Sequence, residues 1–139
     1  MQEIALLTSL SLPADAAMRE LICAYEEFFP EQIVGYYVEG SYADHSYLAT
    51  SDIDVTIVFR SGITDKTLRE AKQLWSRSSR TSTMELDITV VDEESLRGGM
   101  DLLLKLGSLL IYGTDIRGKY SIVSIADWTH QRMHAAYLR

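Results

Sequence analysis

The sequence predicts an α/β fold of the α+β type, in which a mixed β-sheet of three to five strands is flanked by helices. Short runs rich in β-branched and aromatic residues alternate along the chain with longer segments whose apolar residues recur every three or four positions. The expected order is helix, strand, loop, strand, helix, strand, helix and further helix. Elements in this order are expected to form one sheet covered by helices.

The first half of the chain contains one expected helix and two expected strands. Pro13 suits the first turn of the helix, and Pro30 ends it. The first strand is aromatic and β-branched, and the second has the sequence IDVTIVF. The expected elements are helix 14–29, strand Ile33–Glu39, polar loop Tyr42–Ser51 and strand Ile53–Phe59.

The second half begins with a helix that Thr64 or Asp65 can cap. A third strand follows, and Asp92 then caps a helical segment that Gly98-Gly99 weakens. Leu109–Tyr112 extends that segment or forms a fourth strand, and periodicity does not decide between the two. The expected elements are helix 65–79, strand Met84–Val91, helical segments between Asp92 and Leu106, loop Gly113–Tyr120 and helix Ile125–Leu138.

Composition narrows the class of protein. The chain has 139 residues and a net charge of −7, which argues against nonspecific binding of nucleic acid, because such binding depends on Lys and Arg neutralising phosphates. Cys23 is the only cysteine, so no disulfide forms within one chain. We see no signal peptide and no long apolar run, and therefore expect a cytoplasmic protein without a membrane span.

Three acidic residues lie at the start of the second expected strand and within the third. Asp52 and Asp54 are two residues apart at the start of the second strand, so their side chains point the same way with Cα atoms roughly 6.6 Å apart. Carboxylates at this spacing can share one Mg²⁺ or hold two ions. Asp87 lies between apolar residues of the third strand, where we expect a buried position. If the two strands pair, Asp87 joins the other two as metal ligand or general base.

A small-residue turn lies close to these acids in the sequence. Gly40 lets the backbone approach a phosphate, and Ser41 adds a hydroxyl and an N–H donor. Ser51 directly precedes the first acid, and we place it with Gly40 and Ser41 among the nucleotide-binding candidates. Lys105 and Arg97 could also reach a phosphate, but a solvated helix face explains them equally well.

Taken together, GSYADHSYLATSDIDVTIVF, LDITVV and LLIYGTDIR resemble the nucleotidyltransferase superfamily that includes DNA polymerase β. The resemblance spans roughly Val34 to Arg117, and the minimal and aminoglycoside-modifying branches look most similar. It implies the polymerase β-like fold and a magnesium-dependent transferase with two ions. Such an enzyme moves a nucleoside monophosphate from a nucleoside triphosphate, expected to be ATP, to an acceptor.

Carried over to this chain, the resemblance implies that Gly40 and Ser41 bind the triphosphate. It also implies that Asp52 and Asp54 hold Mg²⁺ and that Asp87 occupies the third acidic position, as metal ligand or base. One departure lies in the loop, where Ala43-Asp44-His45-Ser46 replaces the Gly- and Arg-containing sequence usual in the small branch.

The resemblance leaves the acceptor open. We expect a catalytic domain over residues 1–120 and a C-terminal helix over 121–139, the possible start of a helical domain. The leading expectation is a small-molecule hydroxyl, as in an aminoglycoside-like compound. The alternatives are an antitoxin-type enzyme that modifies a partner protein and a noncatalytic nucleotide-binding module. Oligomerisation stays open, since leucines between Leu102 and Leu110 can face a core or a partner.

Overall fold

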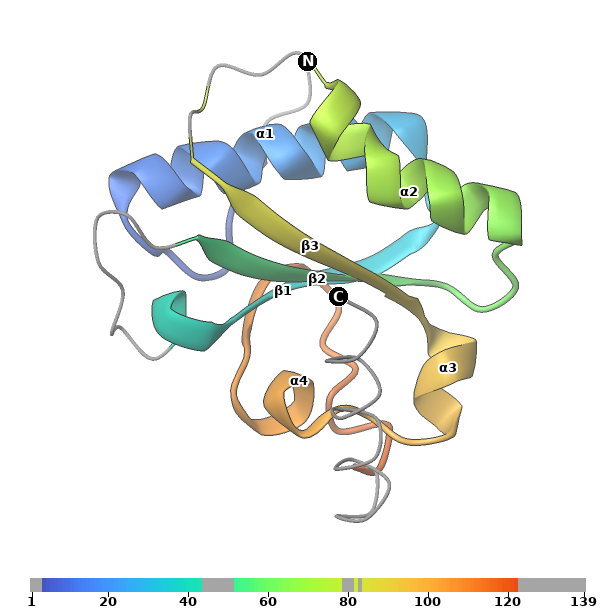
Figure 1. Cartoon of the computed structure of the whole chain (residues 1–139). Coiled ribbons are helices and arrows are strands. Elements are labelled where there is room, and N and C mark those ends of the chain that lie inside the picture. Colours follow the sequence, from blue (N-terminus) through green and yellow to red (C-terminus); the bar gives the residue numbers. More distant parts are fainter. Residues whose placement is uncertain (1–3, 44–51, 79–81, 83, 123–139) are drawn as a thin grey trace, which may run out of the picture.

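The computed structural model describes residues 4–43, 52–78, 82 and 84–122 of the chain. Helices lie on both faces of one twisted sheet (Figure 1). In chain order the elements are α1 (Leu12–Phe28), β1 (Ile33–Glu39), the short 3₁₀ helix η1 (Gly40–Tyr42), β2 (Ile53–Phe59), α2 (Asp65–Arg77), β3 (Leu86–Asp92), α3 (Glu93–Arg97), α4 (Leu102–Leu106) and β4 (Leu109–Gly113).

The sheet has the strand order β3-β2-β1-β4. β1 pairs antiparallel with both β2 and β4, whereas β2 and β3 run parallel and are joined through α2. A parallel pair needs such a crossover, since a tight hairpin cannot connect strands that run the same way. The expected mixed sheet is thus confirmed, and Leu109–Tyr112 belongs to a strand rather than to a helix.

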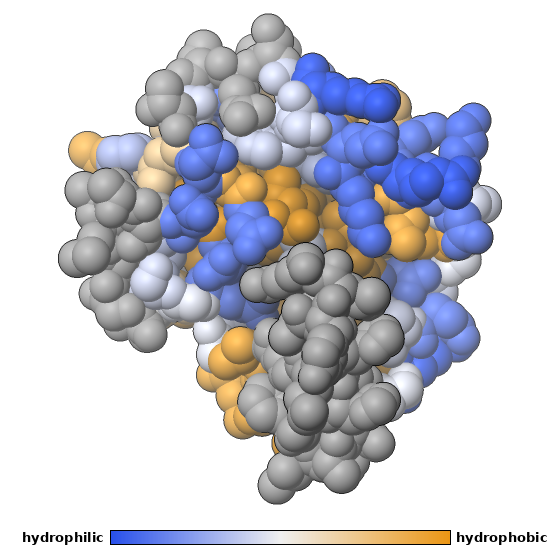
Figure 2. Space-filling model, viewed as in Figure 1, coloured by the Kyte–Doolittle hydropathy of each residue, from blue (hydrophilic) through white to orange (hydrophobic). Residues whose placement is uncertain are grey.

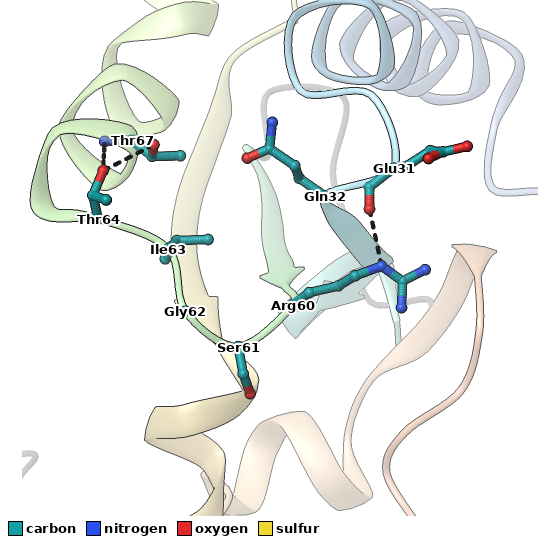
Figure 3. A pocket seen from close by; sticks show the side chains of 8 residues that line it. All are labelled: Glu31, Gln32, Arg60, Ser61, Gly62, Ile63, Thr64 and Thr67. Carbon is teal, nitrogen blue, oxygen red and sulfur yellow. Dashed lines mark hydrogen bonds between the residues drawn. The ribbon is translucent and has the colours of Figure 1, made fainter.

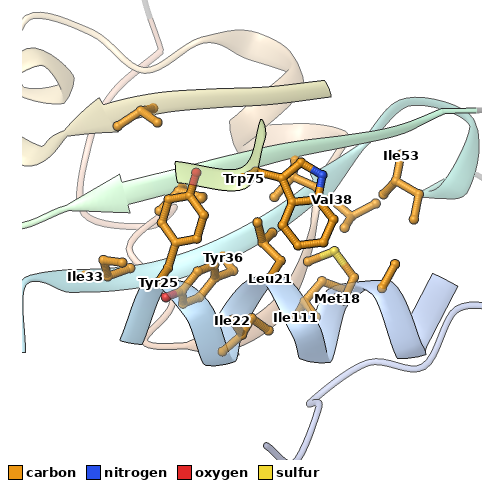
Figure 4. Packing of buried hydrophobic residues seen from close by; sticks show 14 of the residues in the cluster. Met18, Leu21, Ile22, Tyr25, Ile33, Tyr36, Val38, Ile53, Trp75 and Ile111 are labelled. Carbon is orange, nitrogen blue, oxygen red and sulfur yellow. The ribbon is translucent and has the colours of Figure 1, made fainter. Parts of the chain in front are cut away.

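One face of the sheet carries the larger core (Figure 4). Met18, Leu21 and Ile22 of α1 are fully buried against it, as the three-to-four spacing of their helix predicts. Tyr25 joins them and donates a hydrogen bond of 2.5 Å from its hydroxyl to the carbonyl oxygen of Ala71 in α2. Burial raises the pKa of Tyr25 to about 12. This core fixes α1 and α2 over the same face of the sheet.

The opposite face is covered only in part. α3 and α4 lie on this side of the sheet (Figure 1). A smaller core here joins Tyr37 of β1 and Val58 of β2 to Leu96 of α3 and Leu104 of α4, and Met100 between the two short helices completes it. It occupies the end of the face where β2 finishes. The other end, where β1 finishes and β2 starts, is therefore available for polar side chains.

Several predicted boundaries change in the structure. β3 begins at Leu86 rather than Met84, and α2 ends at Arg77 rather than at 79. The expected break at Gly98-Gly99 is confirmed, since the segment from Asp92 to Leu106 forms two five-residue helices. Gly99 adopts a φ of 135°, and Asp101 caps the second helix by accepting from the amides of Leu103 and Leu104.

Some expectations fall on parts of the chain that the structure does not describe. The predicted helix Ile125–Leu138, most of the loop Tyr42–Ser51 and Ser51 itself lie outside the described residues. Within the described part of the chain, every helix is too short or too polar to cross a membrane.

Candidate active site

Three carboxylates lie side by side across three strands at the open end of the sheet. Glu39 of β1 is the register partner of Asp54 in β2, and Asp54 is the register partner of Asp87 in β3. We call these three residues the acid row. Neighbours in register share a face of the sheet, so the row lies on the partly covered face together with Tyr37 and Val58.

Asp54 is the central residue of the row, and its neighbours disfavour its charge. Its pKa is raised, first by burial and then by the charges of Asp87 and Asp52 and a side-chain hydrogen bond with Asp87. The expectation that β2 and β3 pair and bring Asp87 beside Asp54 is confirmed. Asp52 directly precedes β2, is exposed, and lies close enough for its charge to act on Asp54.

Asp87 does not have the buried position expected from its apolar neighbours. Its side chain is exposed for two reasons. β3 is an edge strand of the sheet, and the acid row lies at the end of the sheet face that the small core does not cover. Leu86 and Ile88 are themselves only partly buried, against the larger core. An apolar-acidic-apolar pattern shows that side chains alternate between the two faces of the sheet. It does not show whether the strand lies at the centre or at the edge of that sheet.

The Gly-Ser turn lies directly against the acid row. Gly40 has a φ of 71°, and a Cβ atom added to it would collide with Oδ2 of Asp54. The backbone angle favours glycine at this position, and a larger residue would have to push the Asp54 carboxylate aside. Gly40 starts the turn η1, which is closed by a hydrogen bond of 3.0 Å from the amide of Ala43 to the carbonyl oxygen of Gly40.

The described side chains do not by themselves form a compact metal cluster. In the ranges 4–43, 52–78, 82 and 84–122, no three Asp, Glu, His or Cys side chains converge closely enough to hold a metal ion. The backbone nevertheless sets Asp54 and Asp87 in register, with Asp52 two residues from Asp54. The structure thus brings Gly40, Asp52, Asp54 and Asp87 together, and Ser41 directly follows Gly40 in η1.

Glu39 is the member of the row that the sequence pattern did not reveal. It directly precedes Gly40, and its carboxylate accepts a hydrogen bond of 2.9 Å from the hydroxyl of Thr56. An acidic residue at the end of a strand is ordinarily solvated, so only the register with Asp54 sets it apart. The available signal was its position immediately before the Gly-Ser pair.

A separate cavity of about 410 Å³ lies at the opposite end of β1 and β2 (Figure 3). Arg60 borders it and donates from Nε to the carbonyl oxygen of Glu31 at 2.9 Å. Since Ile33 pairs with Phe59 at this end and Glu39 with Asp54 at the other, the cavity does not belong to the acid row. Its lining residues are Glu31, Gln32, Arg60, Ser61, Gly62, Ile63, Thr64 and Thr67.

Comparison with known families matches the segment that carries these features. The profile described as "Nucleotidyltransferase domain" matches residues 18–120, which include the turn and the whole acid row. The chain belongs to the nucleotidyltransferase domain family. Membership confirms the resemblance seen in the sequence and implies transferase activity.

Two solved structures are similar to this nucleotidyltransferase domain. One, from Sulfolobus solfataricus and provisionally assigned as a nucleotidyltransferase, shares 22% identity with a TM-score of 0.49, over 85% of this chain and 99% of that chain. The other is described as a toxin-antitoxin with AMP-PNP and shares 17% identity with a TM-score of 0.49, over 86% of this chain and 93% of that chain. No curated protein matches the sequence.

Proposed function

We propose that this nucleotidyltransferase domain moves a nucleoside monophosphate from a nucleoside triphosphate, which we take to be ATP, to a hydroxyl group of a small-molecule acceptor. The observation that carries the proposal is the packing of Gly40 against Asp54. A phosphate that approaches the backbone at Gly40 would lie beside a carboxylate. Two anions at that distance repel strongly unless a cation lies between them.

Asp52 and two members of the acid row supply the ligands that such a cation needs. Asp52, Asp54 and Asp87 would hold Mg²⁺, most simply as a pair of ions, since carboxylate oxygens are preferred ligands of this metal. The raised pKa of Asp54 fits this role, because a divalent cation would remove the penalty that the neighbouring charges impose. When bound, Mg²⁺ would neutralise the triphosphate.

The reaction itself is an in-line displacement at the α-phosphorus. A bond forms between the acceptor oxygen and the α-phosphorus, the bond from that phosphorus to the bridging oxygen breaks, and pyrophosphate leaves with the electron pair. The acceptor hydroxyl loses its proton to a base, for which we propose Asp87. The exposure of Asp87 on the edge strand supports this role, since an acceptor can reach it from solvent.

The charge of the site favours a particular class of acceptor. Glu39 adds a carboxylate beyond the three that would hold metal, and the chain carries a net charge of −7. A surface of this kind attracts cations, so an aminoglycoside-like acceptor with several ammonium groups and hydroxyls fits it best. Modification of a hydroxyl on a partner protein is the second acceptor to test.

The proposal is tested by titration calorimetry with Mg²⁺ and each of the four nucleoside triphosphates, followed by measurement of pyrophosphate release with candidate acceptors. Asp54→Asn and Asp52→Asn should each abolish magnesium-dependent binding or turnover while circular dichroism stays unchanged. Gly40→Ala should weaken binding at least about tenfold, because its Cβ would displace the carboxylate of Asp54. Glu70→Gln, on the exposed face of α2, is the matched control and should bind normally.

Asp87→Asn separates binding from chemistry. If Asp87 is the base, this variant keeps its affinity for the nucleotide and loses transfer, by about a hundredfold or more. If the variant also loses affinity for the nucleotide with Mg²⁺, Asp87 is instead a metal ligand. The function proposed here is wrong if the wild-type chain binds none of the four triphosphates with Mg²⁺, or if both Asp52→Asn and Asp54→Asn keep full activity.

A further inference from the structure

Glu39 and Thr56 form a side-chain hydrogen bond at the point where β1 ends. The Thr56 hydroxyl donates to Oε2 of Glu39 at 2.9 Å, and Thr56 is only 4% exposed. Thr56 lies two residues after Asp54, so it is the diagonal neighbour of Glu39 on the same face of the sheet. We call this pair of residues the Glu39–Thr56 clasp.

The clasp lies at a junction that would otherwise be weak. Glu39 and Asp54 are the last registered pair of β1 and β2, and like charges placed directly opposite each other destabilise a strand pair. The Glu39 carboxylate is instead held along the strand by its hydrogen bond with Thr56. The hydrogen bond thus offsets a repulsion that would tend to separate the two strand ends.

The Gly-Ser turn begins directly after this junction. Gly40 continues from Glu39, and its close approach to the Asp54 carboxylate depends on β1 remaining paired up to its last residue. Strand ends open more easily than strand centres. If the end of β1 opened, Gly40 and Ser41 would move away from Asp54. The triphosphate-binding turn would then be separated from the proposed metal ligand.

We propose that Glu39 is a positioning residue that acts through its hydrogen bond with Thr56. The clasp holds the end of β1 against β2 and so keeps Gly40 and Ser41 at a fixed distance from Asp54. Its effect on nucleotide binding rests on the proposed function, whereas its effect on the turn does not. In holding the turn, Glu39 acts as a hydrogen-bond acceptor, so for this role its oxygen matters and its negative charge does not.

Four variants separate the hydrogen bond from the charge. Thr56→Val preserves the shape of the buried side chain and removes the donor, and Glu39→Ala removes the acceptor. Thr56→Ser and Glu39→Gln each keep a group able to form the hydrogen bond, and Glu39→Gln also removes the charge. Thr89→Val is the control. Thr89 is the register partner of Thr56 in the neighbouring strand β3, so the same substitution is made beside the Glu39–Thr56 clasp but not in it.

The first measurement is amide hydrogen exchange of Gly40, Ser41, Tyr42 and Ala43 in the protein without nucleotide. We expect exchange about five- to tenfold faster in Thr56→Val and Glu39→Ala, as for the loss of one side-chain hydrogen bond. Wild-type rates are expected in Glu39→Gln, Thr56→Ser and Thr89→Val. Unchanged exchange in Thr56→Val, or equal acceleration in Glu39→Gln and Glu39→Ala, would overturn the inference.

The second measurement is calorimetric titration of the same variants with ATP and Mg²⁺. The affinity should fall about five- to tenfold in the two variants whose turn exchanges faster, and recover in Glu39→Gln and Thr56→Ser. Accelerated exchange without any fall in affinity would overturn the role in binding. If the wild-type chain binds no nucleotide, the proposed function fails on its own, and the exchange data still decide whether the clasp holds the turn.

Discussion

At the scale of single residues, Asp54 contributes unfavourably to the stability of the fold. Its carboxylate is partly buried beside Asp87 and Asp52, and its pKa is raised as a result. The native chain therefore binds this proton more tightly than the unfolded chain does. Stability falls as the pH rises from the unfolded pKa, near 3.9, through the folded value, because the unfolded state then loses the proton first. Functional sites commonly retain such a penalty.

Asp54→Asn is accordingly expected to stabilise the metal-free protein at neutral pH. The variant removes the charge and keeps an amide that can donate to Asp87. We expect its melting temperature at pH 7 to exceed that of the wild type by about 2–4 °C, and the difference to shrink toward pH 4. Thermal unfolding followed by circular dichroism in chelator at both pH values measures this. An equal or lower melting temperature at pH 7 would contradict the electrostatic account of Asp54.

At the scale of elements, the segment after β4 is held by a polar cluster in addition to Ile116, which is buried in the smaller core. Asp115 accepts two parallel hydrogen bonds from Arg117, from Nε at 2.9 Å and Nη2 at 2.8 Å, and also lies 3.2 Å from the hydroxyl of Tyr37. Arg117 lies over the ring of Tyr37, and the Lys105 ammonium donates to the carbonyl oxygens of Arg117 and Tyr120. Lys105 therefore stabilises this segment.

This cluster makes the fold sensitive to acid. Hydrogen bonds from Arg117 hold the pKa of Asp115 well below its usual range. A lowered native pKa stabilises the protein above the unfolded value near 3.9, and the contribution is lost as the pH falls below it. The Asp115 side chain is 44% exposed, so solvent reduces the contribution of the pair to about 1 kcal/mol.

Asp115→Asn should therefore lower the free energy of unfolding by about 1 kcal/mol at pH 7, with a smaller loss near pH 3. Urea titrations at the two pH values provide the measurement. Glu94→Gln is the control, because Glu94 and Arg97 form an ion pair in which both side chains are more than half exposed. If Asp115→Asn lowers the free energy of unfolding equally at pH 7 and near pH 3, the charge of Asp115 is not the source of the effect.

At the scale of the whole molecule, local patterns predicted the strands and their chemistry but not the order of the strands. IVGYYVE and IDVTIVF form β1 and β2 at the predicted bounds. The exposure of Asp87 and the place of Glu39 follow from register and from the edge position of β3, which depend on pairing between distant segments. Gly98-Gly99 did predict the break between α3 and α4, where Gly99 adopts a φ of 135°.

Among the described residues, several large hydrophobic side chains are exposed, and two of them lie on α4. Leu103 and Leu106 of α4 are 47% and 72% exposed. Figure 2, seen from the same side as Figure 1, shows hydrophobic surface where α4 lies. The acid row lies at the end of this face away from the small core, so metal and nucleotide would meet the sheet where it is polar.

The most direct test of the central claim, that Gly40 and the acid row form one nucleotide and metal site, uses Mn²⁺ in place of Mg²⁺. Mn²⁺ takes the same oxygen ligands and broadens nearby amide resonances. With a nonhydrolysable ATP analogue, we predict strongest broadening at Gly40, Asp54 and Asp87, lost in Asp54→Asn. Broadening centred on the Arg60–Thr64 cavity, or unchanged in Asp54→Asn, would contradict the account.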